Sequence, residues 1–325
     1  MIHAPTWPTL GASSAHLVGS RLLAVASAQP DRIVTAADLG RPFDRTADWV
    51  RDRTGIDQVH RLDHGGDVVA LAVDAARTAL DRAGLAAAEV DLVLTASCSI
   101  TAPTADDLAH AIAPRAGRMY LNAACSGFCY ALSTADNLIR TGAATTVLVV
   151  AAEQMSALLD PADLATSIIF GDGAGAAVLT ATDRSNAAIG PLVCGSDGTR
   201  AALIACRNDG LLEMMGREVF RWAVETVPTL ALEICHRAGL RLADLAAFIP
   251  HQANRRIIDA VANRLGVPTM HVSTDISRSG NASAASIPIA LDRLLSDHPE
   301  LGGRHALLIG FGAGLAYAGQ VIRLP

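Results

Sequence analysis

The sequence predicts an α/β fold built from two similar halves. Along the 325 residues, short apolar runs alternate with Ala- and Leu-rich segments of helical spacing, a pattern typical of buried strands separated by helices. Two pairs of related motifs also occur in the same order in both halves. Hydrophobic residues make up 51% of the chain, which is compatible with large buried cores and argues against disorder.

Six apolar runs are predicted as strands. In the first half they are Asp91–Ala96, Thr146–Ala152 and Gly175–Ala181. In the second half they are Leu245–Pro250, His305–Gly310 and Leu315–Ile322. Helical spacing of apolar residues predicts helices over Val68–Arg82 and Val227–Arg237. Each helix is followed by Ala-Gly-Leu, in which glycine suits the left-handed position after a helix.

The internal repeat rests on two motif pairs. Arg82–Leu85 (RAGL) recurs as Arg237–Leu240, each before a strand, and Gly171–Gly175 (GDGAG) corresponds to Gly310–Gly314 (GFGAG). Because the order is the same in both halves, we predict a duplicated α/β domain. We expect residues 1–183 to form one half and residues 184–325 the other, with the boundary in the polar stretch Thr182–Asn186.

The composition excludes several classes of function. No lysine occurs, so all 26 basic side chains are arginine, and mechanisms that need a Schiff-base lysine or a P-loop lysine are excluded. The net charge of −6 argues against non-specific binding to nucleic acids or anionic membranes. The six cysteines form no CxxC pair, so we expect neither a disulfide scaffold nor a metal site. Without a signal-peptide pattern or a membrane-length apolar run, we expect a cytoplasmic protein with reduced thiols.

Cys125 is the candidate nucleophile. It lies among small residues in Asn122–Phe128 (NAACSGF), directly before a segment of helical spacing that ends near Gly142. A helix N-terminus favours a thiolate, and small neighbours leave room for a bulky thioester. The other cysteines are interpreted as structural, the usual role of a free cysteine: Cys98, Cys129, Cys194, Cys206 and Cys235.

His251 and Asn281 are the candidate partners of the nucleophile. His251 directly follows a predicted strand, and strand ends are where α/β folds usually carry their sites. Asn281 lies in a loop of small residues, Ser279–Ser286. As a neutral donor beside a histidine, Asn281 could hold a thioester oxygen while negative charge develops on it.

These residues resemble the β-ketoacyl-acyl-carrier-protein synthase III family, which has the thiolase fold. The resemblance runs from Arg21 to the C-terminus and rests on seven motifs in the family's order. They are TADWVRDRTGI, NAACSGFCYAL, SIIFGDGAGAAVL, GREVFRWAV, IPHQANRRII, SGNASAASIPIAL and GFGAG. The resemblance implies two similar α/β halves in a layered α-β-α-β-α architecture, and a homodimer.

The resemblance also implies the chemistry. Cys125 would take an acyl group from acyl-CoA, and malonyl carried on acyl-carrier protein (ACP) would then lose carbon dioxide and attack the acyl-cysteine. His251 and Asn281 would stabilise the enolate, and Phe311 would lie beside the decarboxylating group. The backbone N–H groups of Cys125 and Ala313 would form the oxyanion hole, where one donor typically contributes about 3–4 kcal/mol. Acyl-CoA and malonyl-ACP are substrates, and no cofactor is expected.

Further positions match the family's binding residues. Trp49 and Arg53 match positions that stack on the CoA adenine, Arg256 a position near the phosphates, and Gly216 and Phe220 positions along the pantetheine channel. Acyl-carrier proteins are strongly acidic, so we predict a basic docking surface for them. Its residues are Arg217, Arg221, Arg255, Arg256 and Arg264.

The sequence departs from the family pattern at three places. Tyr120 replaces a usual aspartate five residues before Cys125, which changes the support beneath the nucleophile. Ala102 replaces a frequent phenylalanine before Pro103 at the wall of the acyl pocket, so a primer other than acetyl-CoA is compatible with the sequence. The segment Gly198–Glu213 is also short. The alanine at position 102 and the short Gly198–Glu213 segment both fit a specialised pathway such as polyketide starter selection.

Three functions remain open from the sequence. The first is a decarboxylating condensing enzyme that initiates fatty-acid or polyketide synthesis. The second is an acyl-CoA-dependent acyltransferase of a polyketide pathway without condensation, which Asn281 disfavours because plain transfer needs no enolate donor. The third is a non-catalytic ketosynthase-like subunit, which the retained Cys125 disfavours.

Overall fold

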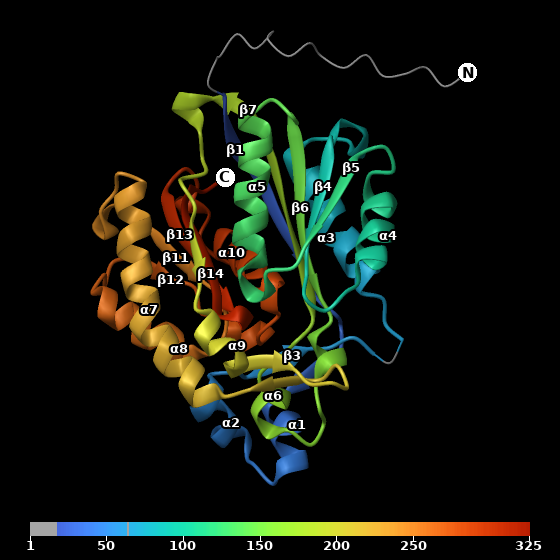
Figure 1. Cartoon of the computed structure of the whole chain (residues 1–325), viewed down its shortest axis with the longest axis vertical. Helices are drawn as coiled ribbons and strands as arrows, with labels where there is room; N and C mark the ends of the chain where they lie inside the picture. Colours follow the sequence, from blue (N-terminus) through green and yellow to red (C-terminus); the bar gives the residue numbers. More distant parts are fainter. Residues whose placement is uncertain (1–17, 64) are drawn as a thin grey trace.

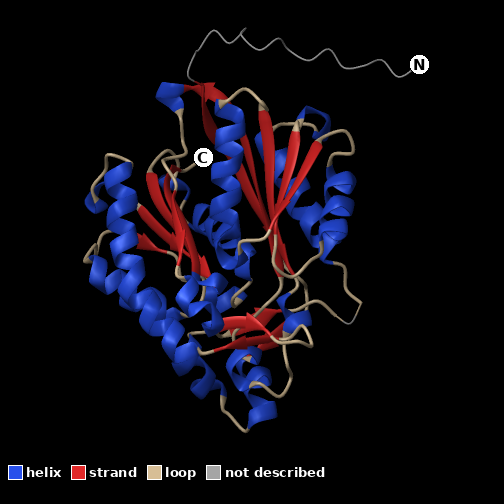
Figure 2. Cartoon of the chain, viewed as in Figure 1, coloured by secondary structure: helices blue, strands red, loops and turns tan. Residues whose placement is uncertain are grey.

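The computed structural model describes residues 18–63 and 65–325 and contains two five-stranded sheets (Figures 1 and 2). The N-terminal stretch 1–17, where no signal-peptide pattern was found, lies outside the described residues. In order across the first sheet, the strands are β1 (Val18–Ala28), β7 (Gly173–Asp183), β6 (Thr146–Glu153), β4 (Leu92–Ala96) and β5 (Gly117–Leu121). The second sheet contains β12 (His271–Val272), β11 (Ala247–Pro250), β13 (His305–Gly312), β14 (Ala316–Arg323) and β8 (Val193–Ser196).

The two sheets repeat one pairing pattern. In the first, β4 pairs in parallel with β5 and β6, and β7 pairs antiparallel with β6 and β1. In the second, β11 pairs in parallel with β12 and β13, and β14 pairs antiparallel with β13 and β8. The predicted duplication of the fold is therefore confirmed. The residue at which one half ends stays a prediction.

Three layers of helices enclose the sheets. Outside the first sheet, α3 (Val68–Ala83) and α4 (Ala102–Ile112) bury one apolar core. Between the sheets, α5 (Gly127–Arg140) and α10 (Ser286–Asp297) share a core with strands of both sheets. Outside the second sheet, α7 (Gly216–Arg237) and α8 (Arg255–Leu265) bury a third core. The predicted α-β-α-β-α layering is confirmed.

All six predicted strands are present, and none of their ends differs from the predicted one by more than two residues. The helix predicted over Val227–Arg237 was too short at its start, because α7 begins at Gly216. Its first turns mix charged and apolar residues, and Pro228 lies in its interior. Burial of Val219, Trp222 and Ala223 against the second sheet accounts for the helical first half, since packing can outweigh an unfavourable local sequence.

The remaining elements are short, and Figure 1 shows most of them together at its lower end. They are β2 (Ile33–Thr35), β3 (Gln58–His60), α1 (Ala36–Gly40), α2 (Ala47–Thr54), α6 (Leu164–Ser167), α9 (Ile276–Ser279), β9 (Ile204–Cys206) and β10 (Leu212–Met214). β9 and β10 form an antiparallel hairpin within the short segment Gly198–Glu213 and its neighbour Met214. Across the described ranges, no helix is both long and apolar enough to cross a membrane.

Candidate active site

A cavity of about 1000 Å³ is lined by residues of both halves. Cys125 contributes from the first half, and His251, Asn281 and Phe311 contribute from the second. Ala313 also lines this cavity. The structure therefore brings together the three residues that the sequence predicted to act on one substrate.

The turn before α5 places Cys125 at the cavity wall. Ala124 has a φ of 47°, a left-handed conformation that is unfavourable for alanine, and its N–H donates to Asn122 Oδ1 (3.1 Å). A Cβ atom added at Gly312 would lie 3.0 Å from Cys125 Sγ, and one at Gly310 would lie 2.7 Å from the Ser126 Cα. Glycine at these two positions therefore allows β13 to pass directly against the nucleophile.

The Cys125 thiol is not a stabilised thiolate in this unloaded site. Desolvation in the protein interior raises its pKa to about 12, and the nearby Glu153 carboxylate acts in the same direction. The neighbouring Ser283 hydroxyl lowers the pKa of Cys125, but by less than burial raises it. The raised pKa runs against the prediction that the N-terminus of α5 would favour a thiolate, because desolvation is its largest cause.

His251 follows the last residue of β11, and its ring is held in place from two sides. Its Nδ1 lies 2.7 Å from Ser286 Oγ, and the Ser286 oxygen accepts the N–H of Gln252 (3.3 Å). Phe311 packs edge-on against the imidazole, with ring centroids 5.4 Å apart. Burial lowers the pKa of His251 to about 3, so the ring is neutral at physiological pH. The Ser286 hydroxyl can donate to Nδ1, and in the tautomer with that bond the His251 proton lies on Nε2.

Hydrogen bonding fixes the Asn281 side chain so that its amide nitrogen remains a donor. Its Oδ1 accepts the N–H of Ser283 (2.9 Å), and a backbone N–H can only donate, so the Asn281 nitrogen is the remaining donor. Its main chain bonds to the first half, from Asn281 N to Ile169 O (2.9 Å) and from Gly171 N to Asn281 O (3.1 Å). Asn281 therefore joins the two halves at the site.

Sequence reasoning missed Cys98, Ser283 and Glu153. Cys98 lines the cavity, although it was interpreted as structural, and its Sγ lies 3.1 Å from Ser283 Oγ. The same sulfur donates to Glu153 Oε1 (3.4 Å). A signal was available for Cys98, since it lies just after strand β4, at the same kind of strand end that singled out His251.

The predicted CoA-binding residues lie close together. Arg53, Gly216, Phe220 and Arg256 line the cavity, and the Arg256 guanidinium lies 5.8 Å from the centroid of the Phe220 ring. Trp49 is not among the lining residues. Its ring is instead contacted by the guanidinium groups of Arg45 (5.2 Å from the ring centroid) and Arg53 (5.3 Å), so Arg53 stacks on Trp49 itself.

The predicted docking arginines divide into two groups. Arg217, Arg221 and Arg264 line the cavity with Arg256, and Arg264 also donates to the carbonyl of Val224 (2.8 Å). Arg255 does not line the cavity and instead pairs with Asp259, with Nε 2.7 Å from Oδ1.

Ala102 and Tyr120, two of the departures from the family pattern, lie outside the cavity lining. Ala102 is exposed at the start of α4, so in this single chain it does not form the acyl-pocket wall that the sequence predicted. The Tyr120 hydroxyl lies 3.0 Å from the carbonyl oxygens of Ser97 and Ile100. Tyr120 therefore supports the loop that carries Cys98.

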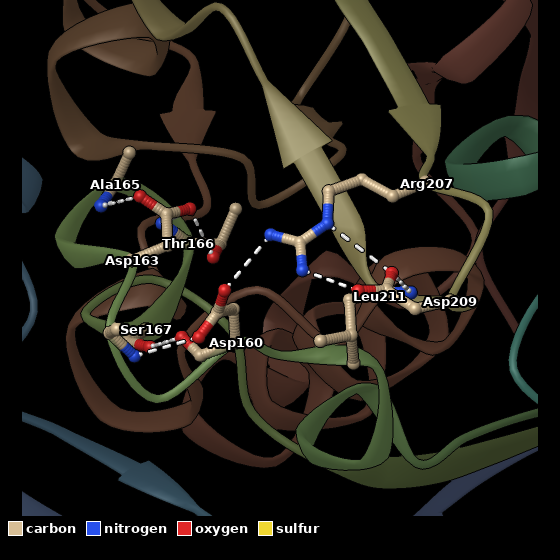
Figure 3. A network of polar contacts seen from close by, with 9 residues as sticks. Asp160, Asp163, Ala165, Thr166, Ser167, Arg207, Asp209 and Leu211 are labelled. Atoms are coloured by element: carbon tan, nitrogen blue, oxygen red, sulfur yellow. Dashed lines mark hydrogen bonds and ion pairs between the residues drawn. The ribbon is translucent and has the colours of Figure 1, made fainter.

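The apolar wall of the cavity comes from two segments far apart in sequence. Met155, Leu158, Ile169 and Phe170 belong to the first half, and Ile204, Leu212 and Met214 belong to the β9–β10 hairpin. Figure 3 shows Arg207 of the hairpin between Asp160 and Asp209. Arg207 donates to Asp160 Oδ2 (2.9 Å) across the two segments and to Asp209 Oδ2 (2.5 Å) within the hairpin.

A possible metal-ligand cluster lies elsewhere. Over the residues that the structure describes, His271, His298 and Glu300 are the group with suitably close ligand atoms, and none of them lines the cavity.

The sequence matches two family models. The model for 3-oxoacyl-[acyl-carrier-protein (ACP)] synthase III matches residues 119–198, and the model for its C-terminal part matches residues 235–324. A β-ketoacyl-[acyl-carrier-protein] synthase III from Streptomyces lividans is 43% identical, with 94% of this chain and 95% of that protein covered. A second such protein, from Streptomyces avermitilis, is 42% identical, with 94% and 99% covered.

Solved structures agree with these matches. The priming β-ketosynthase of the R1128 polyketide biosynthetic pathway superimposes with a TM-score of 0.91 at 42% identity, covering 94% of this chain and 96% of that one. The 3-oxoacyl-(acyl carrier protein) synthase III of Pseudomonas aeruginosa gives a TM-score of 0.88 at 35% identity, covering 94% and 98%.

Proposed function

Because the chain belongs to the 3-oxoacyl-[acyl-carrier-protein] synthase III family and is a condensing enzyme of that type, we propose that Cys125 is acylated by acyl-CoA and then condensed with malonyl-ACP. The observation that carries this assignment is the convergence of Cys125, His251 and Asn281 on one cavity. The enzyme is in this sense an acyltransferase as well as a condensing enzyme.

In the first half-reaction, the Cys125 sulfur attacks the acyl-CoA carbonyl and the bond to the CoA sulfur breaks. The close approach of Gly312 to Cys125 supports an oxyanion hole made by the backbone N–H groups of Cys125 and Ala313. Two such donors stabilise the tetrahedral intermediate where its negative charge develops.

In the second half-reaction, malonyl-ACP loses carbon dioxide and the resulting enolate carbon attacks the acyl-cysteine. Two neutral donors can stabilise an enolate oxygen without protonating its carbon too early. The neutral His251, with its proton on Nε2, and the Asn281 amide nitrogen provide such a pair. The Phe311 ring packs against His251 and adds an apolar surface that favours loss of the charged carboxylate.

Arginine accounts for all the cationic side chains along the proposed substrate path. Arg53 and Arg256 support binding of the CoA phosphates, beside Gly216 and Phe220 in the pantetheine channel. We assign docking of the acidic carrier protein to Arg217, Arg221, Arg255, Arg256 and Arg264. Guanidinium groups form bidentate contacts with phosphates and carboxylates, which suits both ligands.

Stacking of the CoA adenine on Trp49 requires a local rearrangement. Arg45 and Arg53 both already lie over its ring, so we propose that an adenine stacks there after one guanidinium moves away. We propose that Arg53, which lines the cavity, is the one that moves.

The two alternative functions are not favoured. A non-catalytic subunit has no need for a nucleophile packed against the glycines of β13. An acyltransferase without condensation has no need for Asn281 as an oriented amide donor beside a neutral histidine.

We further propose a homodimer in the cytoplasm and a primer other than acetyl-CoA. The relative from the R1128 pathway is a priming ketosynthase, which supports a role in polyketide initiation. Ala102 does not line the cavity of its own chain. Its predicted effect on acyl selection therefore depends on the proposed dimer.

Loading of a panel of acyl-CoAs tests this function. Intact-protein mass spectrometry should show one acyl group on Cys125, a preference for particular acyl chains, and no adduct in the Cys125→Ala variant. Absence of an adduct on folded wild-type protein with every acyl-CoA tested would refute the assignment of Cys125.

A further inference from the structure

Two histidines and one glutamate meet at the edge of the second sheet. His271 belongs to β12, the edge strand, and His298 and Glu300 follow α10. Each of the three side chains offers a ligand atom, and these atoms all lie within 4.8 Å of one another. The centroids of the two imidazole rings are 4.5 Å apart, and His298 Nδ1 lies 3.0 Å from Glu300 Oε1. None of these residues lines the cavity that contains Cys125, so the proposed reaction does not account for the cluster.

The main chain beneath these three side chains is held in place. The His298 carbonyl accepts the N–H of Leu301 (3.1 Å), whose side chain is buried in the core between the sheets. Pro299, with its restricted φ, lies between His298 and Glu300. On the other side, the His271 N–H donates to the carbonyl of the residue before β11 (2.9 Å). Side-chain rotations alone are therefore needed to bring the three ligand atoms closer together.

The three donor atoms suit a zinc ion. Imidazole nitrogens and a carboxylate oxygen are common zinc ligands, and two histidines, one glutamate and a water form a known type of four-coordinate zinc site. Bonds of about 2.0–2.1 Å place neighbouring ligands of a tetrahedral ion roughly 3.3 Å apart. His298 Nδ1 and Glu300 Oε1 are already near this separation, and the Glu300 side chain is exposed and able to adjust.

The local charges also favour a cation. The C-terminal end of α10 carries partial negative charge on its free carbonyl groups, and its last turn contains no basic residue. Asp297, the last residue of α10, adds a carboxylate. In the part of the chain that the structure describes, Glu300 pairs with His298 and with no arginine. A bound metal ion would supply the permanent positive charge that this end of the helix lacks.

We propose that His271, His298 and Glu300 bind one Zn²⁺ ion, with water as the fourth ligand, and that the ion joins β12 to the end of α10. The role of this site is structural. The same helix begins at Ser286, which holds His251, so zinc fixes the far end of the helix that supports the catalytic histidine. The cysteine spacings predict no metal site, and His271 lies too far from His298 along the chain to form a recognisable ligand motif.

Zinc titration of the full-length protein tests the site. The protein is stripped of metal with a chelator, and isothermal titration calorimetry with Zn²⁺ then measures stoichiometry and affinity. We expect one such site per chain in the wild type. Binding should be at least about tenfold weaker in His271→Ala and in His298→Ala, because loss of even an outer partner of a metal ligand typically costs that much affinity. His236→Ala, which removes an exposed histidine at the end of α7, is the matched control and should bind as the wild type does.

Free thiols are the main competing zinc ligands, since Cys194 and Cys206 are exposed. Titration with Co²⁺ separates the two kinds of site, because a thiolate ligand adds a near-ultraviolet charge-transfer band that nitrogen and oxygen ligands do not give. The visible Co²⁺ absorption of the wild type should appear without that band and should be lost in His271→Ala. A Co²⁺ spectrum that is unchanged in His271→Ala would place the ion elsewhere and contradict the proposal.

Thermal unfolding gives a second readout. Zinc should raise the Tm of the wild type by a few degrees, because an ion that binds only the folded state stabilises it. The Tm of His271→Ala and His298→Ala should not respond, and an equal rise in all three proteins would count against the site.

Equal zinc affinity in the wild type and both histidine variants would overturn the proposal, as would the absence of zinc binding to folded wild-type protein. If a histidine variant does not fold, as judged by circular dichroism, Glu300→Gln decides, because Glu300 is exposed and the amide keeps its size while removing its charge. Acyl loading of Cys125 enters none of these readouts. The outcome is therefore independent of the proposed function.

Discussion

The Cys125 thiol lies before the first turn of α5, where a helix dipole favours negative charge, yet desolvation raises its pKa to about 12. His251 is also neutral, because burial lowers its pKa to about 3. The resting site therefore has no thiolate–imidazolium pair. It is suited to stabilise charge that appears during the reaction at the substrate oxygen.

The first prediction concerns alkylation of Cys125 by iodoacetamide. Because only the thiolate reacts and the pKa lies near 12, the rate at Cys125 should rise about tenfold per pH unit between pH 7 and pH 10. Peptide mass spectrometry can separate this site from the exposed Cys194, which serves as a control for reagent activity. A rate that reaches a plateau below pH 8 would show that a stabilised thiolate exists after all.

The second prediction concerns Ser286, which holds Nδ1 of His251. Ser286→Ala removes the hydroxyl that fixes the proton on Nε2, and loss of one buried hydrogen bond typically costs about 1–3 kcal/mol. Condensation from preformed acyl-enzyme should fall roughly tenfold or more, while acyl loading changes little. Ser296→Ala, on the same helix but bonded only to the carbonyl of Asp292, is the matched control. Equal loss of loading and condensation in Ser286→Ala would argue for a purely structural role.

Sequence patterns identified Cys125, His251 and Asn281 because each lies in a distinctive local context, at a helix start, a strand end or a loop of small residues. Cys98, Ser283 and Glu153 could not be found in this way as a group. The contact between Cys98 and Ser283 spans 185 positions, and that between Ala284 and Glu153 spans 131. Pairing of β4 with β6 brings Cys98 and Glu153 together within the first half, and only the packing of the two halves adds Ser283.

At the scale of elements, buried strands were predictable and the cavity wall was not. β6 and β13 are apolar along most of their length and are buried at nearly every position, so composition alone marks them. The β9–β10 hairpin has two strands of three residues each, too short for an alternating pattern. Its position depends on the bond of Arg207 to Asp160, 47 positions earlier in the chain.

The third prediction concerns this hairpin. Arg207→Ala or Asp160→Ala should loosen it from the segment that carries Leu158 and Ile169, and so broaden the range of acyl chains loaded onto Cys125. The expected change is a few-fold decrease in kcat/KM for the preferred acyl-CoA with little change in Tm, because exposed ion pairs contribute little to stability. Asp209→Ala is the control, because it leaves the bond of Arg207 to Asp160 and removes only contacts within the hairpin, those of Asp209 with Arg207 and with the Leu211 N–H. Unchanged chain selectivity in both Arg207→Ala and Asp160→Ala would refute the role of the contact.

At the scale of the whole molecule, the reaction site exists only where the two halves meet. Asn281 of the second half bonds through its main chain to Ile169 and Gly171 of the first, and β13 of the second half packs against Cys125. Arg53 and Arg256 line the same cavity from opposite halves. Because the chain has no lysine, arginine supplies every cation proposed to bind CoA and the carrier protein.

The central claim is that this junction performs a decarboxylating condensation on an acyl group held by Cys125. It is tested most directly by a single turnover in which isolated acyl-Cys125 enzyme is mixed with malonyl-ACP, and carbon dioxide and the carrier-bound product are counted. We predict one carbon dioxide and one β-ketoacyl-ACP for each acyl-enzyme consumed, with the free Cys125 thiol recovered. Transfer of the intact acyl group to the carrier without release of carbon dioxide would contradict the account.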